Sequence, residues 1–194
     1  MIRETIVVAT RNMGKLREFQ TLLQPLRCHV QSLKDLAIDA EVEESGHTFA
    51  ENARLKAIGY SHLTSLPVLA DDSGLEVAAL DGRPGIHSAR YAGTDASDAD
   101  RIHKLLGELE SFDGAPEARF VCAIALAQNG EILRESTGTC SGVIIREPRG
   151  SKGFGYDPIF LFPEQGKTFA ELNETEKNQY SHRARAVVEL LRNI

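Results

Sequence analysis

The sequence predicts an α/β protein built on a mixed β-sheet flanked by helices. In the N-terminal half, short apolar runs alternate with amphipathic segments, as in parallel strand–helix units. Two long segments that read as strands, at 118–128 and 131–145, flank the dipeptide Asn129-Gly130, a strong signal for an antiparallel hairpin. Parallel units combined with a long hairpin predict a sheet of mixed orientation.

The first half of the chain justifies this fold element by element. Apolar residues at helical spacing predict the first helix, and Thr48 with Glu51 forms a T-x-x-E capping box that begins the second. The expected order is a strand at 5–10, a helix at 16–23, a strand at 28–32, an acidic loop at 39–46, a helix from 48 to about 63, a strand ending at Asp71 and Asp72, a turn at Gly74 and a further strand to residue 80.

The second half begins with a loop at 81–97 and a second capping box, Ser97 with Asp100, which starts a helix. The two hairpin strands follow, then a glycine- and proline-rich loop at 146–158 and a strand at 159–162. The last segment is expected to be helical, with a core stripe formed by Tyr180, Ala184, Val187, Val188 and Leu191.

Composition limits the partners. The 194 residues, 42% hydrophobic and 26% charged, suit one domain (1–194) or two closely joined lobes. With 28 acidic and 22 basic residues the net charge is −6, whereas proteins that bind duplex nucleic acid usually carry a basic excess. We therefore expect no nucleic-acid partner, and any phosphate-bearing partner to be small.

Neither a leader nor a membrane span is expected. The stretch MIRETIVVAT is too short and polar for a signal peptide, and the longest apolar run, Val121–Ala127, is far shorter than a span. Cys28, Cys122 and Cys140 are scattered and form no C-x-x-C pair, which indicates reduced thiols. These features predict a cytoplasmic protein that does not bind membranes.

The connector Thr10–Lys15, between the first strand and the first helix, is unusually polar. It holds a hydroxyl, an amide and two cations, where a plain turn needs only a glycine and a cap. One interpretation is a solvated turn. The other is an anion site at a helix N-terminus, where the macrodipole favours negative charge.

Carboxylates form the second candidate cluster. Asp71 and Asp72 follow an apolar run, and successive strand residues point to opposite faces, so one carboxylate is expected to face a site while the other supports it. Glu41, Glu43 and Glu44 lie on the acidic loop; alone they indicate a solvated face, and with Asp72 they can complete a site for Mg²⁺.

Two later segments can contact a ligand. FGYDP, at 154–158, places two aromatic rings and a carboxylate in a glycine loop, which can stack on a flat ligand or simply fill the loop. EKNQYSHRARA contains Lys177, His182 and Arg183. These three side chains do not share one face of a straight helix, so their convergence on one ligand requires the helix to break or restart near Ser181, or the ligand to sit at the helix end.

Together these segments resemble the inosine/xanthosine triphosphate pyrophosphatase family, which removes non-standard purine nucleotides from the nucleotide pool. The matching segments, in order, are ATRNMGK, EESGHTFAENARLKA, ADDSGLEV, PGIHSARYAG, GFGYDPIF and TEKNQYSHRARA, and they cover nearly the whole chain. Arg11 stands where some members of the family have glycine.

The resemblance implies a homodimeric, two-lobed α/β fold with a central cleft along a long sheet. It implies Mg²⁺-dependent hydrolysis of ITP, dITP and XTP to the monophosphate and pyrophosphate. By motif, the implied metal ligands are Glu43 and Asp72, and Asp72 and Lys56 are catalytic. The implied substrate contacts are Thr10, Arg11, Asn12, Met13, Gly14, Lys15, Ser73, Phe154, Gly155, Tyr156, Asp157, Lys177, His182 and Arg183.

Two alternatives stay open at this stage. One is a related pyrophosphatase that acts on other modified nucleotides, as the similarly folded Maf-like proteins do. The other is a module that binds nucleotides without hydrolysing them. The set Glu43, Asp72 and Lys56 favours hydrolysis, because a sensor needs neither a metal nor a base.

Overall fold

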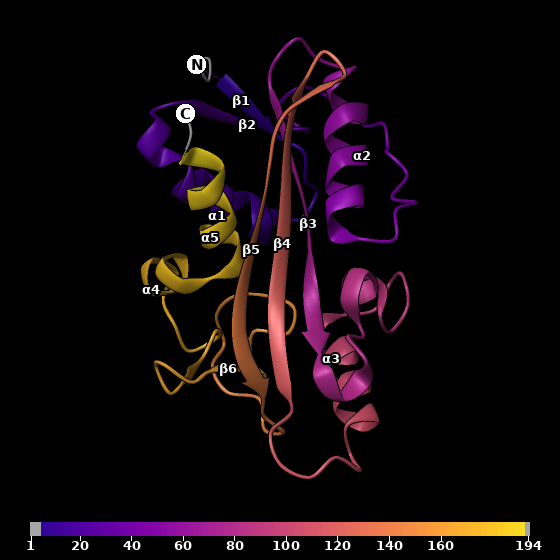
Figure 1. The fold of residues 1–194 in the computed structure, drawn as a ribbon, viewed down its shortest axis with the longest axis vertical. Coiled ribbons are helices and arrows are strands. Elements are labelled where there is room, and N and C mark those ends of the chain that lie inside the picture. Colours follow the sequence, from indigo (N-terminus) through magenta and orange to yellow (C-terminus); the bar gives the residue numbers. More distant parts are fainter. Residues whose placement is uncertain (1–4, 193–194) are drawn as a thin grey trace. The chain divides into compact units, whose positions relative to one another are not determined.

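The structure is a computed structural model that describes residues 5–192. The chain divides into two compact units, and the three long strands contribute to both. Unit 1 comprises the described residues up to Asp72, Cys122–Gly138 and those from His182 onward, and unit 2 comprises Ser73–Val121 and Thr139–Ser181. The α/β class is confirmed (Figure 1).

Strands and helices lie close to where periodicity and capping signals predict them. The strands are β1 (Thr5–Val8), β2 (His29–Ser32), β3 (Val68–Val77), β4 (Glu117–Gln128), β5 (Glu131–Ile144), β6 (Phe160–Phe162) and β7 (Lys167–Thr168). The helices are α1 (Met13–Leu22), α2 (Phe49–Ser61), α3 (Asp98–Glu108), α4 (Glu174–Tyr180) and α5 (His182–Leu191), with short 3₁₀ turns at Gln24–Leu26, Ala78–Leu80 and Gly85–Arg90.

The sheet is mixed, as predicted. Its strand order is β2-β1-β3-β4-β5-β6-β7. β1 pairs in parallel with β2 and with β3, whereas β6 pairs antiparallel with β5 and with β7. Asn129 and Gly130 both have positive φ, at 53° and 82°, which suits the tight turn that joins β4 to β5.

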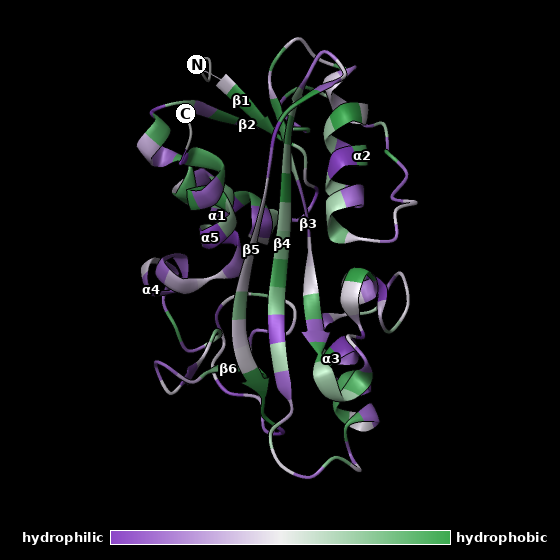
Figure 2. Cartoon of the chain, in the orientation of Figure 1, coloured by the Kyte–Doolittle hydropathy of each residue, from purple (hydrophilic) through white to green (hydrophobic). Residues whose placement is uncertain are grey.

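The core of unit 1 is formed by β1, the first part of β3 and the last part of β4, with α1 and α5 packed against them. Ile6, Phe19, Leu69 and Ile124 are at most 1% exposed, and Ala186 and Val187 of α5 belong to the same cluster. The unit 1 part of β4 is almost entirely apolar (Figure 2). This strand therefore lies inside the unit, and α1 and α5 lie side by side on it (Figure 1).

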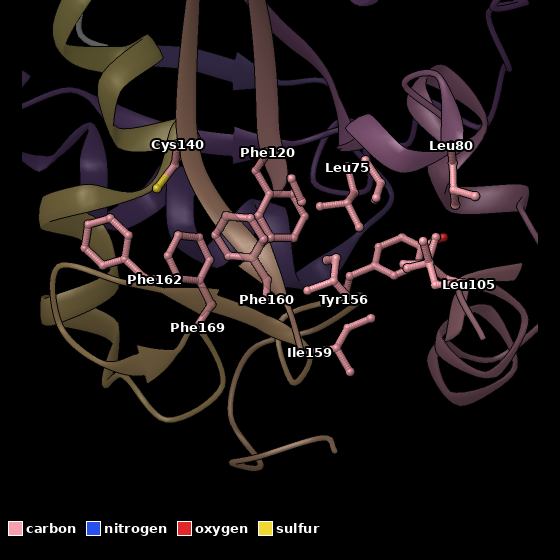
Figure 3. Packing of buried hydrophobic residues seen from close by; sticks show 14 of the residues in the cluster. Leu75, Leu80, Leu105, Phe120, Cys140, Tyr156, Ile159, Phe160, Phe162 and Phe169 are labelled. Atoms are coloured by element: carbon pink, nitrogen blue, oxygen red, sulfur yellow. The ribbon is translucent and has the colours of Figure 1, made fainter. Parts of the chain in front are cut away.

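The core of unit 2 is aromatic. The ring centroids of Phe120 and Phe160 lie 4.6 Å apart, and those of Phe160 and Phe169 lie 4.9 Å apart at 61° (Figure 3). Phe162 and Tyr180 extend this stack. Tilted and edge-to-face contacts between aromatic rings stabilise the core beyond the contribution of the apolar area that the rings bury.

The predicted break within residues 66–80 is wrong. β3 continues without interruption through Asp71, Asp72 and Gly74. Gly74 makes no turn; a Cβ atom there would lie 2.4 Å from Oγ of Ser88 and 2.5 Å from the carbonyl oxygen of Gly85. The glycine therefore permits a close approach by the 3₁₀ turn at Gly85–Arg90.

The C-terminal helix breaks at Ser181, one of the two possibilities considered from the sequence. Ser181 has an extended backbone (φ −63°, ψ 154°), and α5 starts at the next residue. Part of the predicted core stripe is wrong: within α5, Val187 and Leu190 are buried whereas Val188 is 55% exposed, so α5 packs through a different face from the predicted one. β7, only two residues long, was not predicted.

No helix in the described range is both long and apolar enough to cross a membrane. Among these residues all three cysteines are free thiols, and Cys122 and Cys140 are buried.

Candidate active site

The polar connector forms the cap of α1. Oδ1 of Asn12 accepts hydrogen bonds from the backbone N–H groups of Gly14 (2.8 Å) and Lys15 (3.1 Å). The backbone N–H of Asn12 in turn donates to Oγ1 of Thr10 at 3.2 Å. Asn12 is therefore the N-cap that starts the helix at Met13, and the connector presents the positive end of the helix dipole, as an anion site requires.

Arg11 contacts the acidic loop. Its Nη2 donates to the carbonyl oxygens of Asp39 (2.6 Å) and Ala40 (3.1 Å), and its Nε lies 4.0 Å from a carboxylate oxygen of Glu41. The Arg11 side chain thus ties the start of the acidic loop to the connector.

Asp72 is buried on β3 and meets two residues of α2 that lie one turn apart. Nδ2 of Asn52 donates to Oδ2 of Asp72 at 3.1 Å, and Nζ of Lys56 lies 3.8 Å from Oδ1. Oδ1 of Asn52 accepts from the backbone N–H of Gly46 at 2.8 Å. Asn52 therefore links the end of the acidic loop to the carboxylate that is predicted to be catalytic.

Burial changes the acid–base properties of this pair. Loss of solvation raises the pKa of Asp72 above its ordinary value, and the opposing effect of Lys56 is the smaller one. Burial alone would lower the pKa of Lys56, but Asp72, Asp71 and Glu44 together raise it. The ammonium thus stays charged, while Asp72 has a higher proton affinity than an exposed aspartate, as suits a general base.

The carboxylate oxygens near Asp72 are of the ligand type that Mg²⁺ prefers. Nζ of Lys56 lies 3.0 Å from a carboxylate oxygen of Glu44 and 3.8 Å from one of Asp72. Because one lysine is shared by two carboxylates, ionised Asp72 can accommodate further positive charge. Glu43 is exposed and makes no ion pair in the described part of the chain, whereas its neighbour Glu44 is engaged by Lys56. Residues 5–192 contain no group of three or more His, Cys, Asp or Glu side chains arranged to hold a metal. Mg²⁺ commonly needs fewer, because substrate phosphates and water complete its shell.

Asp71 is buried and belongs to a second cluster of charged side chains in unit 1. Its Oδ2 lies 2.9 Å from Nζ of Lys15 and 3.5 Å from Nη2 of Arg183. Arg183 also forms an ion pair with Glu18 through Nη1, and its guanidinium lies over the ring of Phe19. Three elements, α1, β3 and α5, are joined by these charges. His182, beside Arg183, is also buried.

Unit 2 brings three of its predicted site residues together. Oδ2 of Asp157 lies 2.6 Å from Nζ of Lys177 and accepts from the backbone N–H of Phe154 at 2.9 Å. Nζ of Lys177 also lies 4.9 Å from the centre of the Phe154 ring. Asp157 therefore shapes the glycine loop and holds the lysine over an aromatic ring.

The remaining predicted residues of unit 2 have structural contacts. The hydroxyl of Tyr156 donates to the carbonyl of Ser88 at 3.0 Å, and burial raises its pKa. Gly155 has φ 63° and its N–H donates to Asp98 at 2.6 Å. Ser73 lies half-buried in β3, directly after Asp72.

Sequence reasoning missed Asn52, Glu18 and the specific role of Glu44. Asn52 was open to prediction, because it lies one helical turn before Lys56 on a helix with a clear capping box. Glu18 was not, because its partner Arg183 is 165 residues away in sequence.

The fold and these clusters define a class: an α/β protein that gathers carboxylates and lysines beside a capped helix N-terminus, a combination suited to phosphorylated ligands. The chain belongs to the Ham1 family, whose model matches residues 6–193.

The chain is similar to named relatives and to solved structures over almost its whole length. It is 54% identical over 189 residues to a dITP/XTP pyrophosphatase of Geobacillus kaustophilus, covering 95% of this chain and 91% of that protein. It is 45% identical to the dITP/XTP pyrophosphatase of Bacillus subtilis, covering 98% and 96%. Among solved structures, a HAM1 protein from Coxiella burnetii matches with a TM-score of 0.86 at 46% identity (98% and 96% covered), and the Ham1 protein of Staphylococcus aureus with 0.84 at 44% (96% and 95% covered).

Proposed function

We propose that this protein hydrolyses the non-standard purine nucleoside triphosphates dITP, XTP and ITP to the monophosphate and pyrophosphate, with Mg²⁺ as cofactor. The observation that carries the proposal is buried Asp72 beside Lys56, on β3, the strand that contains the segment Asp71-Asp72-Ser73-Gly74. Full-length relatives named dITP/XTP pyrophosphatases support the substrate class.

The catalytic, metal-binding and phosphate-binding residues of unit 1 have separate proposed tasks. Asp72 accepts the proton of the attacking water while the bond between the first two phosphates breaks, and Lys56 stabilises the charge that develops on the phosphoryl oxygens. Lys15 and the N-terminus of α1, with residues from Thr10 to Gly14, bind the phosphates. A bound Mg²⁺, held by Glu43 and Asp72, would neutralise phosphate charge and polarise the phosphoryl group.

The base and sugar are proposed to contact Phe154, Gly155, Tyr156, Asp157, Lys177, His182 and Arg183, and Ser73 to contact phosphate. Hypoxanthine and xanthine carry an acceptor oxygen at position 6, where adenine carries a donor. A site that offers donors there leaves them unpaired with adenine, and such a polar mismatch discriminates by roughly 10⁴-fold or more.

A panel of nucleoside triphosphates tests the proposal. We expect dITP, XTP and ITP to be cleaved with release of pyrophosphate and not orthophosphate, and the standard nucleotides to be cleaved poorly. Chelation of Mg²⁺ should stop the reaction, and re-addition should restore it.

The same panel separates the alternatives. Preference for other modified nucleotides would favour a Maf-like activity, and binding of ITP without product would indicate a nucleotide-binding module.

We further propose, from the family resemblance, that the protein is a cytoplasmic homodimer. Sedimentation of the purified protein at the mass of one chain would contradict the dimer.

A further inference from the structure

Asp71 has no task in the proposed reaction, yet it is among the most buried charged groups of unit 1. Its side chain is 1% exposed and lies on the face of β3 opposite to that of Asp72. Oδ2 meets Nζ of Lys15 at 2.9 Å and Nη2 of Arg183 at 3.5 Å, and Sγ of Cys122 lies 3.9 Å away. A carboxylate in this position requires compensation by positive charge.

Two cations supply this compensation, because Nζ of Lys15 and Nη2 of Arg183 approach the same carboxylate oxygen of Asp71. Glu18 supplies the second carboxylate that balances Arg183. The cluster of Lys15, Arg183, Asp71 and Glu18 therefore carries two charges of each sign.

Lys15 is the member of this cluster that belongs to the connector Thr10–Lys15. It lies in the first turn of α1, which Asn12 caps, and its side chain is 16% exposed. A lysine side chain on its own samples many rotamers, and fixing one costs conformational entropy. The carboxylate of Asp71, held in turn by Arg183, selects one position for the ammonium group before a ligand arrives.

We propose that Asp71 is a positioning residue, which holds the ammonium group of Lys15 where it receives a phosphate of the substrate. The proposal rests on the phosphate-binding role proposed above for Lys15. Asp71 also carries a negative charge that repels phosphate, but Lys15 and Arg183 already neutralise it. Positioning is therefore the larger effect, and removing the carboxylate weakens phosphate binding.

A double-mutant cycle tests the proposal, with Mg²⁺-pyrophosphate as the probe and calorimetry as the measurement. We expect Lys15→Met and Asp71→Asn each to raise Kd about tenfold, in the range seen for coupled neighbours. In the Lys15→Met background, Asp71→Asn should change Kd less than about twofold, because the group that it positions is gone. Additive losses, unchanged binding by Asp71→Asn or tighter binding would each overturn the proposal.

Glu18→Gln is the matched control. It removes a carboxylate from the same cluster but leaves the contact between Lys15 and Asp71 in place, so binding by the folded variant should equal that of the wild type. Weakening equal to that of Asp71→Asn would assign the effect to the cluster as a whole and overturn the positioning role.

A second substitution at the same position keeps the test possible if Asp71→Asn does not fold. Asp71→Glu keeps the charge balance with Arg183 and moves the carboxylate by one methylene, and we expect a Kd raised about threefold or more. Wild-type binding by this variant would overturn the proposal. Wild-type binding by Lys15→Met would instead remove the phosphate-binding role of Lys15, an outcome that is distinct from a failure confined to Asp71.

Discussion

Replacing Arg183 with methionine tests the energetic role of the buried cluster. Arg183 is 1% exposed and pairs with Glu18 and Asp71 inside unit 1. Removing one partner of a buried ion pair costs about 3–5 kcal/mol, because the remaining charge stays buried without its partner. For a chain of this size, this loss corresponds to a melting temperature lower by about 6–20 °C.

The assay is thermal unfolding at pH 7, followed by circular dichroism. Glu18→Gln added to Arg183→Met should recover at least half of the loss, because it removes the carboxylate that lost its guanidinium partner. Arg192→Met is the matched control: its pair with Glu189 has side chains 67% and 48% exposed, and exposed pairs contribute only about 0–1 kcal/mol. A fall for Arg183→Met no larger than that of the control would refute the reasoning.

Three further predictions concern separate features. Burial raises the pKa of Asp72 in the folded state, so ionising this carboxyl group above its unfolded-state pKa lowers the stability of the fold. Asp72→Asn should therefore melt no lower than the wild type at pH 7, and any gain in melting temperature over the wild type should shrink toward about pH 4. Gly74→Ala places a Cβ atom 2.4 Å from Oγ of Ser88, and urea unfolding should show a loss of about 1–3 kcal/mol; an unchanged midpoint would contradict the close approach. Arg183→Lys keeps the charge but removes the guanidinium fork, so the ratio of kcat/KM for ITP to that for ATP should fall about tenfold; equal falls for both substrates would leave Arg183 only its role in the buried cluster.

Local signals predicted most of the fold. The capping boxes at Thr48 and Ser97 and the Asn129-Gly130 turn act through neighbouring residues, and all three are present in the structure. The failures involve distant contacts. Gly74 was interpreted as a turn because the residue it accommodates, Ser88, is not local, and Val188 was assigned to the core because helical spacing alone does not show which face of α5 packs against the sheet.

The candidate site shows the same limit. Strand alternation correctly predicted that Asp71 and Asp72 serve different surroundings, but the interpretation did not identify their partners. Lys15, Asn52 and Arg183 come from three different helices, and only the packing of unit 1 shows which carboxylate each one meets.

The most direct measurement of the central claim is kcat for XTP with Mg²⁺, compared between the wild type and Asp72→Asn. Asp113→Asn, at an exposed loop aspartate, is the control. Loss of a general base typically lowers the rate about 10²–10⁴-fold, so we expect kcat to fall at least 100-fold for Asp72→Asn, with a melting temperature no lower than that of the wild type and the control fully active. Turnover by Asp72→Asn within threefold of the wild type would contradict the assignment of Asp72 as the catalytic base.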